Sequence, residues 1–294
     1  MMPMPKRWLT SLMVRCGGVN LLIDCGEGTQ IAMKEKGWSP KPIHIISFTH
    51  YHADHISGLP GLLLSMGNAE KTTPLIMIGP KGLERVVSAL RVIAPELPFP
   101  VRYYELTEAR HKIECAPFVI DAYKVNHNVT CYGYSVSVPR DGKFDRTRAE
   151  QFNIPMKLWS RLQKGETIAA DGITYTPDMV MGPPRRGLKV TYCTDTRPVA
   201  VISEYASDAD LFICEGMYGE DGMEGKARER KHMTMQEGAG IAARAQIPPR
   251  EMWFTHYSPS MIRPDEYIEG VRNIFPGAKC ARDGWSIDLG YDEE

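Results

Sequence analysis

Four metal-ligand residues are crowded into positions 50–55 of this chain. The run Thr49-His50-Tyr51-His52-Ala53-Asp54-His55 has the form H-x-H-x-D-H, and it follows the apolar, β-branched segment 43–48. We expect that segment to be a buried strand, because short apolar and β-branched runs favour strands. His50 and His52, two positions apart on extended chain, point to the same side and can share one cation. Asp54 and His55 then lie at the turn and can serve a second, adjacent cation.

The turn itself is marked by Gly58, Pro60 and Gly61, and the leucines that follow predict a buried helix. The alternative is that the four polar residues are simply exposed on a loop. We disfavour it, because four ligand-type residues converging at a strand-to-helix corner are typical of a catalytic metal site. His44 lies inside the apolar strand, where a hydrogen-bonded core histidine is expected, and we do not count it as a ligand.

Three further residues stand directly after apolar or β-prone runs, as the first motif does. They are His127, Asp195 and His256, which follow segments 118–125, 189–194 and 252–255. Each alone would be taken for a turn or capping residue. Because residues at the ends of strands along one sheet edge can converge on one cleft, the three together are candidate metal ligands.

The composition is that of a globular protein, with 43% hydrophobic and 24% charged residues in 294. We find no apolar run long enough for a membrane helix and no secretion signal. Seven scattered cysteines without a CxxC pair favour a reducing compartment, so we expect a cytoplasmic location. The net charge is −1, but residues 140–189 carry ten basic and six acidic side chains, a local +4 that phosphate binding could use. A mildly basic solvated surface is the alternative explanation.

Alternating strand and helix patterns in each half predict one layered α/β domain. We expect strands at 21–24, 43–48, 75–78, 118–125, 134–138, 189–193, 211–214 and 252–255, and helices near 30–36, 59–66, 82–93 and 234–245. Trp159, in the basic segment, is either a packing anchor or a platform on which a base stacks, and we favour packing.

Several stretches carry a resemblance to a known family. They are Asp24-Cys25-Gly26-Glu27-Gly28-Thr29-Gln30, the motif at 50–55, Gly182-Pro183-Pro184-Arg185-Arg186-Gly187, Asp195-Thr196-Arg197-Pro198, Lys231-His232-Met233-Thr234 and Thr255-His256-Tyr257-Ser258-Pro259. With them, nearly the whole chain resembles the metallo-β-lactamase superfamily and, within it, the ribonuclease Z family of tRNA 3′-processing endonucleases.

The resemblance implies a fold and a ligand set. The fold is an αββα four-layer sandwich of the metallo-β-lactamase type, formed as a single domain over 1–294 with a substrate-binding arm inserted at 140–188. It implies two zinc ions per chain, although these ligands also suit Mn²⁺ or Fe²⁺. One ion would be held by His50, His52 and His127, the second by Asp54, His55 and His256, with Asp195 between them. It also implies a homodimer in which the arm grips the precursor tRNA.

Such a site would hydrolyse a phosphodiester with a hydroxide bound by two metal ions. Asp54 would accept a hydrogen bond from that hydroxide and take its proton. His232, just before the helix predicted from Thr234, is the candidate donor of a proton to the leaving oxygen, although its position alone also fits a surface residue. Glu215 resembles the acidic partner that orients this histidine in the family.

Two other functions stay open. The site could act on small phosphodiesters, cyclic nucleotides, thioesters or lactones without tRNA specificity. The chain could also be a metal-stabilised binding module without turnover, which the full ligand set disfavours.

Overall fold

The computed structural model describes residues 2–5, 7–170 and 172–292. The chain forms two compact units. The first consists of Met1–Ser137 and Lys189–Leu289, and the second of Val138–Leu188 and Gly290–Glu294. The chain leaves the first unit through one strand of a sheet and returns through the neighbouring strand of the same sheet.

The first unit contains two sheets in the part of the chain that is described. The first has five strands in the order β1-β2-β3-β4-β5, and the second has seven in the order β14-β13-β12-β11-β8-β7-β6. The first sheet consists of β1 (Leu12–Cys16), β2 (Val19–Ile23), β3 (Ile43–Ser47), β4 (Leu75–Pro80) and β5 (Val101–Leu106). The second consists of β14 (Ala278–Cys280), β13 (Glu251–Thr255), β12 (Leu211–Glu215), β11 (Arg185–Cys193), β8 (Cys131–Arg140), β7 (Phe118–Val125) and β6 (Arg110–Cys115).

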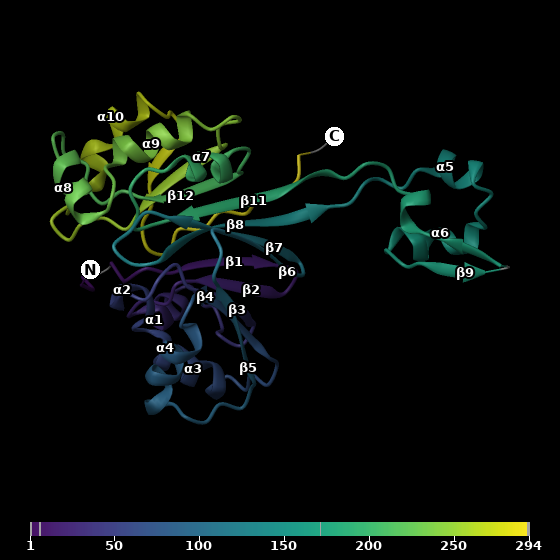
Figure 1. Ribbon diagram of the computed structural model, residues 1–294, viewed down its shortest axis with the longest axis horizontal. Coiled ribbons are helices and arrows are strands. Elements are labelled where there is room, and N and C mark those ends of the chain that lie inside the picture. The colour runs from purple at the N-terminus through teal and green to yellow at the C-terminus, as the bar shows by residue number, and fades with distance from the viewer. Residues whose placement is uncertain (1, 6, 171, 293–294) are drawn as a thin grey trace. The chain divides into compact units, whose positions relative to one another are not determined.

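Helices cover the outer faces of the two sheets, so the layers run helix, sheet, sheet, helix (Figure 1). The first sheet carries α1 (Thr29–Glu35), α2 (Ala53–Ile56), α3 (Leu59–Asn68) and α4 (Leu83–Leu90) on its side of the unit, and the second carries α7 (Ala200–Ala206), α8 (Glu224–Arg230), α9 (Met235–Ala243) and α10 (Ile268–Arg272). The predicted αββα sandwich is confirmed. None of the described helices is long and apolar enough to span a membrane.

Apolar side chains fix these layers. Leu59, Leu62, Leu63 and Met66 of α3 are fully buried in a cluster that also holds the apolar residues of β3. The leucines at 59, 62 and 63 recur three and four positions apart, so they lie on one face of the helix, and that face covers the sheet. The same logic places α9 over the second sheet, in a cluster with Phe212 and Phe254.

Parallel pairing brings several strand ends to one edge of the unit. In the second sheet, Cys193 of β11 lies opposite Cys214 of β12, and Glu215 lies opposite Thr255 of β13. In the first sheet, Ile23 of β2 lies opposite Ser47 of β3. The residues that follow these strands therefore start from neighbouring positions, as expected for a site built at the carboxyl ends of strands.

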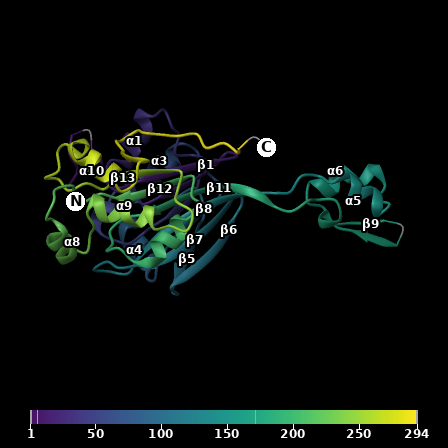
Figure 2. The same ribbon diagram turned by 90° about the horizontal axis from the view of Figure 1, so that it is seen from above.

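The second unit has a small hydrophobic core of its own. It contains α5 (Arg146–Gln151), α6 (Met156–Gln163) and the hairpin of β9 (Ile168–Ala170) and β10 (Ile173–Tyr175), which Figure 2 shows together. Trp159 packs on this core, with its ring 5.3 Å from that of Phe144 and its indole N–H donated to the carbonyl of Ile154. The predicted packing role of Trp159 is confirmed. The substrate-binding role of this segment stays a prediction.

Each predicted strand and helix overlaps an element of the structure, but several elements were missed. The missed strands are β1, β5, β6, β9, β10 and β14. Strand β6 shows why: it lies at the edge of its sheet and reads Arg-His-Lys-Ile-Glu-Cys, without the apolar run that marks a central strand. The seven cysteines are all free in the structure, and five of them are buried.

Candidate metal centre

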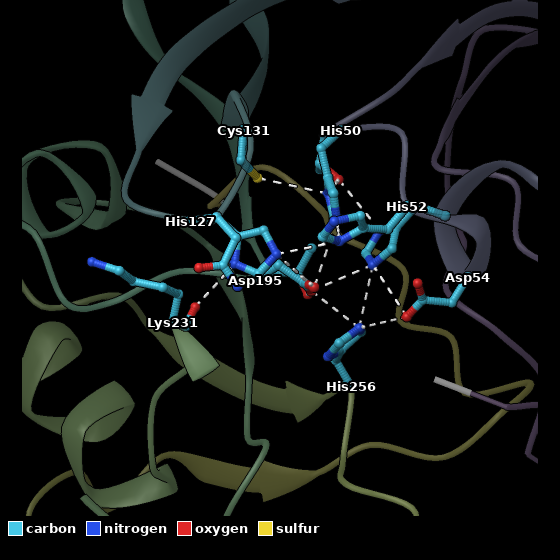
Figure 3. Close-up of polar contacts among 12 residues, drawn as sticks. His50, His52, Asp54, His127, Cys131, Asp195, Lys231 and His256 are labelled. Carbon is cyan, nitrogen blue, oxygen red and sulfur yellow. Dashed lines mark hydrogen bonds and ion pairs between the residues drawn. The ribbon is translucent and has the colours of Figure 1, made fainter. Parts of the chain in front are cut away.

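The structure brings the seven predicted ligand residues together. Their donor atoms form two groups, and within each group the atoms lie within 4.8 Å of one another. The first group holds His50, His52, His127 and Asp195, and the second holds Asp54, His55 and His256. Residues from four separate parts of the chain thus meet at the sheet edge described above (Figure 3).

The loop between β3 and α2 supplies the four residues of the H-x-H-x-D-H motif. His50 is fully buried just beyond the strand, and His52 is the residue before the first turn of α2, with extended backbone. Asp54 and His55 lie within that short helix and are buried. The chain changes from extended to helical between the pair His50 and His52 and the pair Asp54 and His55, so the two pairs face different places. Within the first pair, His50 Nε2 lies 2.9 Å from His52 Nδ1. In the second pair, His55 Nε2 lies 3.3 Å from His256 Nε2, which comes from a distant part of the chain.

Asp195 lies between the two groups, and each of its carboxylate oxygens faces one of them. Oδ2 lies 3.7 Å from Nε2 of both His50 and His127. Oδ1 lies 3.4 Å from His55 Nε2 and 3.0 Å from His256 Nε2. A carboxylate with this orientation can bind two cations at once, one through each oxygen.

The second ring nitrogen of three histidines is held by a hydrogen-bond partner. The partner is Thr49 Oγ1 for His50 (3.1 Å), Asp24 Oδ2 for His55 (2.8 Å) and the Lys231 carbonyl for His127 (3.1 Å, Figure 3). Each partner binds Nδ1, which leaves Nε2 facing the cluster. Outer hydrogen bonds of this kind orient metal-binding imidazoles and fix their tautomer.

Asp24 begins one of the stretches that carry the family resemblance, but the analysis of the sequence gave it no role in the site. Its carboxylate accepts hydrogen bonds from the backbone N–H and the hydroxyl of Thr49 as well as contacting His55. The signal was present, because Asp24 comes directly after β2, Thr49 lies two residues past the end of β3, and the two strands pair in parallel. A buried carboxylate at the end of the neighbouring strand is a natural partner for the first motif.

Two glycines let the Asp24 loop pack tightly against the first motif. A Cβ on Gly26 would lie 2.4 Å from the Asp54 carbonyl oxygen, and a Cβ on Gly58 would lie 2.2 Å from the Gly26 carbonyl oxygen. Both approaches are closer than any side chain tolerates, so the two loops require glycine there.

Three charged or polar site residues have left-handed backbone. The φ angles are 60° for Asp24, 46° for Asp195 and 54° for His256. Non-glycine residues adopt this conformation at a cost and concentrate at functional sites when they do. Here the conformation occurs within two residues of the ends of β2, β11 and β13, where the chain turns.

Burial and neighbouring charges shift the pKa values of the cluster residues in opposite directions. Burial lowers the pKa of His50 to about 2, so its imidazole is neutral and keeps the lone pair that a metal ion needs. Burial alone would raise the pKa of Asp195, but His256 and His55 hold it well below its usual range. Burial would lower the pKa of His55 too, but Asp195 and Asp24 raise it well above its ordinary value, so this imidazole gives up its proton when it binds a cation. Imidazole nitrogens with an ionised carboxylate are the donor set of a divalent metal site. The residues present therefore fit divalent metal ions.

His232 and Glu215 form a pair beside this cluster. His232 Nδ1 lies 2.8 Å from Glu215 Oε2, and the other oxygen of Glu215 accepts the backbone N–H of Thr196. Burial would lower the pKa of His232, but the carboxylate of Glu215 raises it. His232 also lies close to Asp195 and His256, within the same 4.8 Å limit. The structure thus brings together the two residues predicted to act as a proton-donating pair.

Arg197 braces the loop that carries His232. Its guanidinium donates to the His232 carbonyl at 2.5 Å and forms a two-pronged salt bridge with Glu237. Glu237 in turn caps the N-terminus of α9 together with Thr234, whose hydroxyl accepts the Glu237 backbone N–H. Side chains of α9 thus satisfy the backbone N–H groups at its own N-terminus. Through Glu237 and Arg197, the fixed start of α9 holds His232 in place.

The cluster opens into a hollow of about 470 Å³. His52, Asp54, His127, Asp195, His232 and His256 line it, together with Asn128, Met217, Tyr218, Lys226, Arg230, Ser258 and Pro259. Ligand-type residues thus form one wall, and basic and aromatic residues form part of the rest.

Comparison with known proteins identifies the family. The chain is 59% identical over 294 residues to ribonuclease Z of Lachnospira eligens, covering all of this chain and 96% of that protein. It is also 59% identical over 293 residues to ribonuclease Z of Lachnoclostridium phytofermentans, with the same coverage. The chain belongs to the ribonuclease Z family. This membership confirms the resemblance seen in the sequence and the prediction of a metal-dependent hydrolase.

Solved structures confirm the fold. The human short-form tRNase Z superposes with a TM-score of 0.71 at 22% identity, covering 99% of this chain and 96% of that one. The metallo-β-lactamase fold protein YhfI of Bacillus subtilis superposes with a TM-score of 0.66 at 19% identity, covering 96% of this chain and 92% of that one. A family model described as anti-Pycsar protein Apyc1 matches residues 4–92, the part of this ribonuclease Z family chain that contains the first motif.

Proposed function

We propose that this chain is an endoribonuclease that hydrolyses a phosphodiester at the 3′ end of precursor tRNA. The observation that carries the proposal is membership of the ribonuclease Z family over the full chain, together with a complete set of seven ligand-type residues at one sheet edge. The His232–Glu215 pair beside the cluster supplies the acid that cleavage of an RNA strand needs.

We propose zinc as the metal, with two ions per chain. His50, His52 and His127 would hold one, Asp54, His55 and His256 the other, and Asp195 would contact both. When bound, such a pair lowers the pKa of water and offsets charge on the phosphate. Imidazole nitrogens with carboxylate oxygens are the ligands that zinc takes in hydrolases, which supports this choice over hard cations such as Mg²⁺.

The chain's own residues would divide the proton transfers between them. Asp54 lies at the open side of the second group, where its carboxylate can accept the proton of the attacking water. His232 would donate a proton to the leaving oxygen. Glu215, buried and hydrogen-bonded to Nδ1 of His232, would fix the ring so that Nε2 carries the donated proton.

We propose that the second unit binds the RNA outside the cleavage site and that the protein works as a homodimer. The net positive charge of residues 140–189 supports RNA binding by the second unit, because phosphate contacts dominate the affinity of proteins for nucleic acids. A homodimer and a cytoplasmic location remain expectations from the sequence. Light scattering on the purified chain would measure the mass of the assembly.

The test of the function is cleavage of a 3′-extended precursor tRNA by zinc-loaded protein, with elemental analysis of the same sample. We expect cleavage near the discriminator base and about two zinc ions per chain. A chromogenic phosphodiester and a thioester serve as comparison substrates. Turnover of the simple diester without any cut in precursor tRNA would overturn the RNA assignment, and preference for the thioester would overturn phosphodiester hydrolysis altogether.

A further inference from the structure

Helix α8 presents two basic side chains to the hollow that contains the His–Asp cluster. Lys226 and Arg230 both line it, and they are four positions apart, so they share one face of the helix. Arg228 lies between them in the chain, is exposed, and is not among the residues that line the hollow. The helix therefore directs part of its basic charge into the site and part away from it.

The position of this helix is fixed relative to two site histidines. The His232 backbone N–H donates to the Ala227 carbonyl at 2.9 Å, and the Lys231 carbonyl, one residue past the helix, contacts His127 Nδ1. Ala227 is fully buried against Met217 and Tyr218. These contacts tie α8, and with it the basic face, to His232 and His127 of the site.

Lys226 is exposed and, among the described residues, contacts an aromatic ring rather than a carboxylate. Its ammonium lies 5.3 Å from the centroid of the Tyr218 ring, a cation–π contact that leaves the full positive charge available. Tyr218 lines the same hollow, and its carbonyl accepts the backbone N–H of Met235 at the start of α9. Arg230 pairs with its neighbour Glu229 at 3.6 Å, but both side chains are largely exposed and such pairs are weak.

An RNA strand that enters this hollow carries a phosphate on each side of the one that is cut. We propose that Lys226, assisted by Arg230, binds the phosphate next to the scissile phosphodiester on the side of the leaving oxygen. That side is assigned because His232, the proposed proton donor to the leaving oxygen, is attached to the same helix through Ala227. The inference rests on the proposed function, since it needs a polynucleotide substrate.

The first experiment compares two substitutions on one helix. Lys226→Gln and Arg228→Gln each remove one positive charge, so they alter long-range attraction of RNA equally, but only Lys226 lines the hollow. Lys226→Gln should raise KM for precursor tRNA about tenfold and lower kcat by less, because a charged hydrogen bond to phosphate is lost. The slope of log(kcat/KM) against log salt should become shallower by about 0.7, the value for one phosphate contact on a single strand. Arg228→Gln should keep the parental KM.

The second experiment finds the phosphate that Lys226 contacts. Short precursor substrates would carry one neutral methylphosphonate at a time, on either side of the cut. On the leaving-oxygen side, the neutral linkage should weaken cleavage by the parental enzyme but have no further effect on Lys226→Gln. On the other side, the effects of the neutral linkage and of Lys226→Gln should multiply.

The possible outcomes separate this inference from the proposed function. If the parental enzyme hydrolyses a chromogenic diester but never cuts precursor tRNA, both proposals fail. If it cuts precursor tRNA and Lys226→Gln matches Arg228→Gln in KM and salt slope, only the inference is overturned. Multiplying effects at every methylphosphonate position would overturn it as well.

Discussion

The His–Asp cluster and the second unit are built in opposite ways. In the cluster, most polar side chains are buried, the outer ring nitrogens of His50, His55 and His127 are hydrogen-bonded, and strand ends of both sheets position the residues. The second unit has a few buried apolar residues of its own, such as Leu158 and Leu162, while Phe152 and Met156 are exposed. The cluster depends on the whole first unit, whereas the second unit depends on a small local core.

This difference suggests a division of labour. Atoms that carry out chemistry need fixed positions, and strand ends of a large sandwich supply them. A segment that grips a long substrate needs basic charge and tolerates looser construction. Substitutions in the cluster should therefore stop turnover of every substrate, and substitutions in the second unit should alter the handling of RNA first.

The largest effect should come from Asp195, the residue shared by both ligand groups. Asp195→Asn replaces one of the two oxygens that face the groups by an amide nitrogen, which cannot bind a cation. We expect kcat to fall by about 10⁴-fold or more, as when an essential group of a catalytic unit is removed. Kinetics and elemental analysis check this, with circular dichroism to show that the chain still folds.

Glu204→Gln is the matched control for Asp195→Asn. It also converts a carboxylate to an amide, but in an exposed salt bridge with Arg110. It should leave both metal content and kcat at parental values. Parental kinetics in Asp195→Asn would remove the assignment of the site.

His232→Ala should have the next largest effect. Loss of a general acid typically costs about 10²- to 10⁴-fold in rate, and the metal ions should stay because the seven ligand residues are intact. The comparison variant is His111→Ala, which removes a histidine whose Nε2 accepts backbone N–H groups of Thr107 and Glu108 outside the cluster. Should His232→Ala lose metal instead, His232 would be a ligand rather than the acid.

Asp24→Asn tests the outer hydrogen bonds of the cluster. Both carboxylate oxygens of Asp24 accept hydrogen bonds from Thr49 or His55, but Asn has only one accepting oxygen. The His55 ring therefore loses its fixed orientation. Changes of this kind typically weaken metal binding by about 10- to 100-fold. Titration with a chelator of known affinity measures this. Activity should recover in excess metal, and a loss that excess metal does not restore would contradict the positioning role.

The first motif was readable from the sequence because its residues are neighbours in the chain. Local spacing alone placed His50 and His52 on one side of a strand end. His127, Asp195 and His256 could be nominated only as residues after strands, because their convergence depends on which strands pair and in which register. The resemblance of the chain to a known family predicted that these three residues belong to the same site, which periodicity could not.

Other features of the site lay beyond local patterns. The Arg197–Glu237 brace joins residues forty positions apart, and neither follows an apolar run that would mark it. The role of Asp24 requires knowing that β2 lies beside β3. Edge strands such as β6 were missed because a strand with one neighbour needs little apolar surface.

The smallest effect on chemistry should come from Trp159 in the second unit. Trp159→Ala removes a ring packed on Phe144 and a hydrogen bond to Ile154, so the local core should lose about 2–4 kcal/mol. Limited proteolysis should then cut within 138–188 first, and cleavage of precursor tRNA should fall by a larger factor than turnover of a small diester. Met156→Ala, on the same helix but 73% exposed, should change neither measure appreciably. Equal losses on both substrates in Trp159→Ala would mean that the second unit supports the cluster itself, and the division of labour would be wrong.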